Sequence, residues 1–269
     1  MNEILAISYT GDLLAHRRCP RAWAYSQQAG FHPYEQAQAL EGRLIHHSME
    51  WLSEQYRECH VVPSVDLMRQ QLEYRFKVLW ARGLKTAFST KRETIDRVLG
   101  NLYPNGSIHP TIQVAIEGAS HIEYELRAVK KIIPGDFRGK SKLLITGILD
   151  LVLHQREGFH FGKMWNWTDI PNLQGEVRDQ SVYADQGDLE VWDYKGTIAT
   201  TSYLKDYVLQ LLTYARLYQE RAGILPKRCV LFFINEQNFE RQLLVIPITE
   251  SIVDTAEQWT IKQAQLLRH

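Results

Sequence analysis

The stretch Leu189–Lys195 reads LEVWDYK and predicts a short β-strand that ends in charged residues. Residues two apart in a strand share one face, so the carboxylate of Asp193 and the ammonium group of Lys195 project together while Tyr194 points the other way. This arrangement places a candidate metal ligand beside a fixed cation. As an isolated tripeptide, the same pattern also fits an exposed ion pair at a strand end.

A second apolar run, Leu143–Leu153, predicts a mostly buried strand that contains Asp150. A buried carboxylate without partners costs several kcal/mol, so a cation, hydrogen bonds or solvent must satisfy it. If this strand pairs with Leu189–Lys195, the carboxylates of Asp150 and Asp193 converge on one divalent ion. The backbone carbonyl of Tyr194 is then a further oxygen ligand. On its own, Asp150 also fits a capping residue near a turn.

Hydrophobic periodicity places both strands in a chain of mixed helices and strands. Apolar residues recur at helical spacing within residues 40–56 and 65–85. The further predicted elements are strands at His121–Leu126 and Cys229–Ile234, an edge strand at Gln242–Ile248, a loop over Gly100–Pro110, a helix at Tyr203–Ala222, and a last helix at Ser251–Leu267 capped by Ser251. We expect one domain over residues 1–269, divided into a mainly helical region 1–115, an α/β core 116–250 with an insertion at 154–188, and a C-terminal helix 251–269.

Composition limits the classes of function. Hydrophobic residues make up 45% of the 269 residues, which is ample for an ordered core. The 31 basic residues balance 31 acidic ones, so any polyanion must be bound by a local patch. No apolar run reaches the ~20 residues that span a bilayer, and residues 1–6 lack the features of a signal peptide, so we expect a cytoplasmic protein without a membrane segment. Three widely spaced cysteines form no CxxC pair and are expected to be buried, reduced thiols: Cys19, Cys59 and Cys229.

Three segments in this order resemble the PD-(D/E)XK nucleases, specifically their RecB-like and Cas4-like branch: Gly147–Asp150 (GILD), Val191–Lys195 (VWDYK) and Gln210–Tyr214 (QLLTY). The Gln-x3-Tyr helix makes the match specific. Gly42–His46 (GRLIH) resembles the N-terminal histidine motif of that branch, and Cys19–Arg21 (CPR) resembles the motif that precedes it. The resemblance runs from about residue 8 to 235. It implies an α/β fold with a restriction-endonuclease-like core, in which helices flank a central mixed sheet in the order αβββαβ, behind an N-terminal helical region.

The resemblance implies a role for each residue of the candidate site. His46, Asp150 and Asp193 become metal ligands, and the carboxylate-rich set favours Mg²⁺ or Mn²⁺. Lys195 positions or activates the attacking water and stabilises developing negative charge. His47 is the competing histidine, but it points about 100° away on a helix, and only His46 stands four residues after Gly42. A lone helical histidine also fits an ordinary packed or surface residue.

Side chains near the proposed ligands have two possible interpretations, one functional and one structural. Gln210 and Tyr214 share one helix face with Tyr207. The resemblance implies that Gln210 and Tyr214 contact nucleic acid, whereas the aromatic rings also fit ordinary packing against the sheet. Glu50 shares the helix face of His46 and is a candidate for supporting it from behind.

Two features depart from the family pattern. Many members carry an iron-sulfur cluster on one N-terminal and three C-terminal cysteines, but this chain lacks the third and fourth ligands, so no cluster is expected and Cys19 is interpreted as a packed thiol. The second departure is the insertion at 154–188, which mixes tryptophans with acidic residues and suggests a protruding hairpin. It is either a decorative extension, a docking surface for a helicase or other protein partner, or a gate that stacks unpaired bases.

Two basic clusters are candidates for phosphate contact, although most charge runs are solvated faces. They comprise Arg17, Arg18 and Arg21, and Lys130, Lys131, Arg138, Lys140 and Lys142. The predicted function is a metal-dependent DNA nuclease, end-directed or single-strand-preferring, that acts in repair, recombination or defence against foreign DNA. The alternatives are a nuclease-like subunit that binds DNA without cutting it, within a helicase or defence complex, and a nuclease that cleaves RNA.

Overall fold

The fold is known from a computed structural model, which describes residues 5–29, 37–84, 89–131, 142–156, 158–196 and 201–267. The strands are β1 (Leu5–Ser8), β2 (Ala119–Lys131), β3 (Lys142–His154), β4 (Phe159–Asp169), β5 (Gln174–Ala184), β6 (Leu189–Lys195), β7 (Arg228–Phe233) and β8 (Leu243–Pro247). The helices are η1 (Tyr9–Leu14), α1 (Ala15–Arg18), α2 (Pro20–Ala29), α3 (Ala37–Cys59), α4 (Val65–Ala81), α5 (Lys91–Leu102), η2 (Pro104–Gly106), α6 (Pro110–Gly118), α7 (Thr201–Ala222), α8 (Phe239–Gln242) and α9 (Glu250–Gln265).

All the described strands join one mixed sheet in the order β1-β3-β6-β7-β8-β4-β5, and β2 pairs with β3 beside this path. β2 runs antiparallel along one edge of β3. The other edge of β3 is shared, because β1 runs parallel to residues 143–146 and β6 runs antiparallel to residues 151–154. Within the described residues, positions 147–150 of β3 therefore have no strand partner on that edge. This gap is where the candidate site lies.

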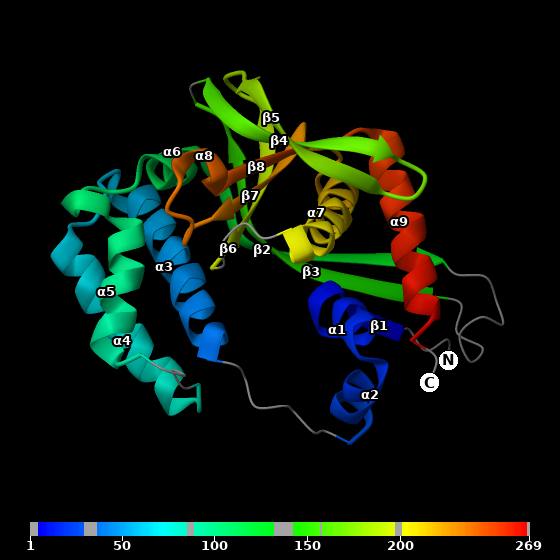
Figure 1. Cartoon of the computed structure of the whole chain (residues 1–269), viewed down its shortest axis with the longest axis horizontal. Coiled ribbons are helices and arrows are strands. Elements are labelled where there is room, and N and C mark those ends of the chain that lie inside the picture. The colour runs from blue at the N-terminus through cyan, green and yellow to red at the C-terminus, as the bar shows by residue number, and fades with distance from the viewer. Residues whose placement is uncertain are drawn as a thin grey trace.

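Helices cover both faces of the sheet (Figure 1). On one face, residues of α3 and α4 such as Ile45 and Leu72 share a core with Trp192 of β6. On the other face, Leu211 of α7 packs in a second core that contains Val191. Every residue of β6 before Lys195 is buried because both faces are covered. This layered α/β architecture confirms the predicted fold class.

Most of the predicted elements are present. β2, β3, β6, β7 and α7 contain or closely match the predicted strands and helix, and α9 matches the last helix. The edge position predicted for Gln242–Ile248 is wrong, since β8 pairs with β7 on one side and touches β4 on the other. The reason is the insertion, which forms the hairpin β4–β5 and continues the sheet beyond β8. Trp167 fastens this hairpin by donating from Nε1 to the carbonyl of Pro247 at 2.9 Å.

Two local predictions about helix ends are also wrong. Residues 100–102 belong to α5, so the predicted loop over Gly100–Pro110 begins only after Leu102. α9 begins at Glu250, its N-cap is Thr249, and no side chain caps it. Ser251 lies inside the first turn and is not the cap. A backbone that enters the helix one or two residues earlier leaves the hydroxyl unable to reach the free N–H groups.

The cysteines differ from the expectation of buried thiols. Cys229 is buried on β7, but Cys19 and Cys59 are exposed. Cys19 is therefore not a packed thiol; its sulfur accepts a hydrogen bond from the backbone N–H of Ala22 at 3.4 Å, in the first turn of α2. Pro20 opens that helix. None of the described helices combines the length and the apolar character that a bilayer span requires.

Candidate active site

The sheet is interrupted at Asp150. The β2–β3 ladder skips Glu123 and Asp150, which occupy facing register positions, and the β3–β6 ladder begins only at Leu151. Glu123 has a φ of 45°, a conformation that costs a non-glycine residue about 1–3 kcal/mol and is concentrated at functional sites. Oδ2 of Asp150 accepts a hydrogen bond from the backbone N–H of Tyr194 at 2.7 Å. This bond satisfies one oxygen of the buried carboxylate.

The other oxygen of Asp150 faces the side chain of His46 on α3. Nδ1 of His46 lies 3.1 Å from Oδ1 of Asp150 and 4.0 Å from Oε1 of Glu123. Each of these three residues offers one ligand atom, and all three atoms lie within 4.8 Å of one another. The structure therefore brings His46 and Asp150 together, as the sequence predicted, and adds Glu123.

Glu123 was missed by sequence reasoning. Its strand was predicted, but the alternation within His121–Leu126 marks only a polar position and does not say what it faces. The missing information was the register of β2 on β3, which sets Glu123 opposite Asp150. Antiparallel register depends on the connecting segment and on packing, neither of which a single strand encodes.

The electrostatics of this cluster favour a bound cation. Burial raises the pKa of Glu123 to about 7, and the neighbouring Asp150 carboxylate adds to the shift. Burial would lower the pKa of His46, but the charge of Asp150 and its hydrogen bond raise it to about 9. The same contact holds the pKa of Asp150 low against the effect of its own burial. Several carboxylates and one imidazole form a hard donor set that fits Mg²⁺ or Mn²⁺.

Asp193 and Lys195 form the second half of the site. Nζ of Lys195 makes an ion pair with Oδ2 of Asp193, which confirms that the two side chains share a face. Burial raises the pKa of Asp193 to about 6, with Asp150 adding to the shift and Lys195 opposing it. Tyr194 points to the opposite face, where its ring lies 6.3 Å from that of Phe232. The role of the Tyr194 carbonyl as a metal ligand stays a prediction.

Three side chains of α7 position Lys195. Its Nζ donates to Oε1 of Gln210 at 3.2 Å and lies 4.5 Å from the ring centre of Tyr207. Gln210 in turn donates from Nε2 to the hydroxyl of Tyr214 at 3.3 Å. Both Gln210 and Tyr214 are buried, so in this structure they support the lysine from behind. Their predicted contact with nucleic acid stays a prediction.

The ring of Tyr214 packs closely against the backbone of β3 at Gly147. A Cβ atom added to Gly147 would lie 2.4 Å from the Tyr214 ring, so a side chain at this position would collide with the ring. This close approach gives a physical reason for the glycine three residues before Asp150. It also anchors the chain of contacts that runs from Tyr214 through Gln210 to Lys195.

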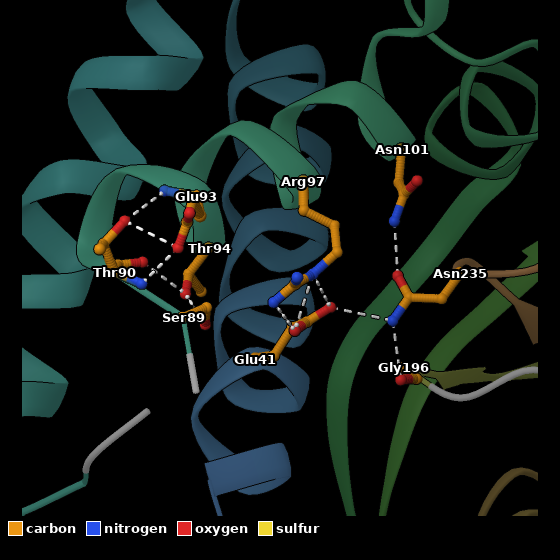
Figure 2. Close-up of polar contacts among 9 residues, drawn as sticks. All are labelled: Glu41, Ser89, Thr90, Glu93, Thr94, Arg97, Asn101, Gly196 and Asn235. Atoms are coloured by element: carbon orange, nitrogen blue, oxygen red, sulfur yellow. Dashed lines mark hydrogen bonds and ion pairs between the residues drawn. The ribbon is translucent and has the colours of Figure 1, made fainter. Parts of the chain in front are cut away.

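A polar network joins α3 to the end of β6 (Figure 2). Asn235, just after β7, donates from Nδ2 to the carbonyl of Gly196 at 2.8 Å and to Oε1 of Glu41 at 3.0 Å. Its Oδ1 accepts from Asn101 of α5 at 2.5 Å. Arg97, also on α5, donates from Nε to Oε1 of Glu41 at 3.1 Å and from Nη2 to Oε2 at 2.7 Å. The network therefore ties the helix that carries His46 to the residue that follows Lys195.

Two glycines allow this junction to close. A Cβ atom added to Gly196 would lie 3.3 Å from Cα of Gly42 and 3.2 Å from Cδ1 of Ile45. The backbone of α3 thus passes directly over the end of β6. Gly42, four residues before His46, supplies the small surface that this contact requires.

The remaining predicted residues have other partners or lie outside the described part. Glu50 is 3.2 Å from Nδ1 of His47, and its negative charge also acts on Glu123, so its support of His46 stays a prediction. Arg17 pairs with Asp206 at 2.7 Å. The side chains of the second basic cluster fall outside the described residues: Lys130, Lys131, Arg138, Lys140 and Lys142.

Comparison with known proteins places the chain in a family. The model of the PD-(D/E)XK nuclease superfamily matches residues 11–162, which is more than half of the chain and includes both His46 and Asp150. No curated protein matches the chain. The match ends before β6, but the Asp193–Lys195 pair lies beside Asp150 in the folded sheet. The chain belongs to the PD-(D/E)XK nuclease superfamily.

Proposed function

We propose that this protein is a cytoplasmic deoxyribonuclease of the RecB-like and Cas4-like branch, without an iron-sulfur cluster, that hydrolyses phosphodiester bonds with Mg²⁺ or Mn²⁺. The observation that carries the proposal is the break in the sheet at Asp150. There a histidine and two carboxylates cluster, and the Asp193–Lys195 pair lies beside them. An isolated strand-end ion pair would not need a buried second carboxylate beside it.

The proposed ligands are His46, Glu123, Asp150 and Asp193, with the backbone carbonyl of Tyr194. A divalent ion bound there supplies Lewis acidity, which polarises a phosphoryl oxygen and makes bound water more acidic. The carboxylates of Glu123, Asp150 and Asp193 and the imidazole of His46 would hold the ion at this point of the sheet. Burial, with the negative charge of Asp150 adding to it, raises the pKa of Glu123 and of Asp193, and a bound cation would offset both effects.

Lys195 is the proposed catalytic cation. Its ammonium group positions the attacking water and faces the non-bridging oxygens as they gain negative charge. Asp193, Gln210 and Tyr207 hold Nζ from three sides, so the charge is placed before the substrate arrives. Gln210 and Tyr214 are the proposed contacts for nucleic acid on this helix once the strand is bound.

The proposed substrate is single-stranded DNA or a duplex end, in repair, recombination or defence against foreign DNA. Hairpin β4–β5 is the proposed docking surface for a helicase or another protein. In the described part of the chain, β5 pairs only with β4, so its outer edge presents free backbone groups.

A cleavage assay with matched substrates tests the proposal. The protein is incubated with end-labelled linear DNA, circular single- and double-stranded DNA, and RNA, each with Mg²⁺, Mn²⁺ or EDTA. We expect cleavage of DNA only with a divalent ion, and slower or absent cleavage of the circular forms. Binding without cleavage under every condition would favour the non-cutting subunit, and cleavage of RNA alone would assign the other substrate.

A further inference from the structure

An aromatic stripe on α7 leads from the candidate catalytic lysine to solvent. Tyr203, Tyr207, Gln210 and Tyr214 are spaced at helical intervals on one face. Tyr214 is 4% exposed at the buried end, whereas Tyr203 is 48% exposed at the other. The Tyr207 ring contacts Lys195, and its centre lies 6.5 Å from that of Tyr203. The exposed tyrosine therefore stands beside the site and not on a remote surface.

The positively charged side chain of Arg18 lies at this exposed end of the stripe. Cζ of Arg18, the last residue of α1, lies 5.2 Å from the ring centre of Tyr203. The neighbouring Arg17 is used internally, because it pairs with Asp206 and lies over Trp259 at 5.1 Å. Arg18 forms no ion pair within the described residues. Of the two arginines, Arg18 is therefore the one that lies next to an exposed ring without an ion pair to any described residue.

We propose that Tyr203 and Arg18 form a stacking ledge for an unpaired nucleotide of the strand that enters the site. This inference rests on the proposed nuclease function and specifies its substrate as single-stranded. An aromatic ring stacks on any base, and the guanidinium group binds the adjacent phosphate, so the ledge is independent of sequence. Bases within a duplex already stack on one another and present no free face to Tyr203. The ledge therefore selects single strands over duplex.

Binding measured without cleavage tests the ledge. Fluorescence anisotropy in EDTA gives the Kd for a labelled 20-nucleotide single strand of mixed sequence and for the matching blunt duplex. We expect Tyr203→Ala to raise the Kd for the single strand about tenfold, equivalent to about 1.4 kcal/mol, and to change the Kd for the duplex less than about twofold. Tyr203→Phe keeps the stacking ring and should behave like the wild type. Arg18→Ala should weaken binding and flatten its dependence on salt.

The chain offers a matched control. Tyr74 of α4 is 58% exposed, and Cζ of Arg75 lies 6.0 Å from its ring centre, so the pair resembles the ledge but lies in the other helical layer. Tyr74→Ala should leave both Kd values unchanged. Equal Kd values for wild type and Tyr203→Ala, an equal loss for single strand and duplex, or failure of the wild type to bind single strands would overturn the inference.

The two proposals fail separately. If the wild type cleaves DNA with a divalent ion but Tyr203→Ala keeps the same preference between single strand and duplex, the ledge is wrong and the nuclease assignment stands. If the wild type binds single strands through Tyr203 but cleaves nothing with any ion, the ledge stands and the nuclease assignment is wrong. Melting temperatures of all variants show whether a change reflects folding.

Discussion

Asp150 shows how a buried strand accommodates an acid. Both neighbouring ladders skip it, the Tyr194 N–H satisfies one oxygen, and His46 meets the other. Leu149 and Leu151 belong to cores on opposite faces of the sheet, although regular alternation would put them on the same face. The regular alternation of side chains between the two faces of β3 is therefore broken at Asp150. This local irregularity directs the carboxylate along the sheet toward its partners.

Replacing Glu123 tests its place among the ligands. Glu123→Gln keeps the size of the side chain but removes a negative oxygen from the cluster, so we expect the affinity for Mn²⁺ to fall at least about tenfold. Isothermal titration calorimetry with Mn²⁺ measures this directly. Glu125→Gln is the control, because Glu125 lies on the same strand but is exposed and pairs with Arg127. Wild-type affinity in Glu123→Gln would remove Glu123 from the site.

At the scale of elements, the site is assembled from α3, β3, β6 and α7, with β2 adding Glu123. The apolar runs predicted β3 and β6, and the acid-x-lysine spacing predicted the Asp193–Lys195 pair, because strand periodicity is a local property. The register between strands is not local, so the position of Glu123 could not be read from its own segment. The same limit explains why the predicted edge position of β8 was wrong. Its neighbour β4 comes from the insertion and is distant in sequence, so this pairing is not local either.

The network around Asn235 is predicted to position His46 relative to Lys195. Asn235→Ala removes the bonds to Gly196 and Glu41, and we expect the rate of DNA cleavage to fall about tenfold, with weaker Mn²⁺ binding, because small displacements of reacting groups are costly. Single-turnover cleavage and Mn²⁺ titration measure the two effects.

A control for folding lies in the same view (Figure 2). Thr90 caps α5 through a reciprocal pair of bonds with Glu93, and the polar contacts of Thr90 with other described residues stay within α5 and its first turn. Thr90→Ala should cost about 1 kcal/mol of stability and leave cleavage and Mn²⁺ affinity unchanged. If Thr90→Ala slows cleavage as much as Asn235→Ala, the network acts only through overall stability.

At the scale of the whole molecule, the two helical layers cover opposite faces of the sheet, and both contribute residues to the candidate site. The layer of α3 supplies His46, and the layer of α7 supplies the residues that hold Lys195. A metal ion held by the proposed ligands would need α3 to be docked on β2 and β3, so its binding energy would add to the free energy of unfolding.

Divalent ions should therefore stabilise the folded protein. At 100 times Kd, a ligand specific for the folded state contributes about 2.7 kcal/mol, so we expect Mn²⁺ to raise the melting temperature relative to EDTA. Differential scanning calorimetry measures the shift. Asp150→Asn should abolish it, while Asp179→Asn, at an exposed carboxylate on β5, should retain it in full. A shift of equal size in Asp150→Asn would place the stabilising ion elsewhere.

We propose that the Asp193–Lys195 pair takes part in metal-dependent hydrolysis of DNA. Single-turnover cleavage of an end-labelled single-stranded DNA, with Mn²⁺ or with EDTA, tests it most directly in the wild type, Asp193→Asn and Lys195→Met. The predicted result is metal-dependent cleavage by the wild type and a rate at least about 100-fold lower in both variants, with melting curves that show folded protein. Wild-type rates in either variant, or undiminished cleavage in EDTA, would contradict the account.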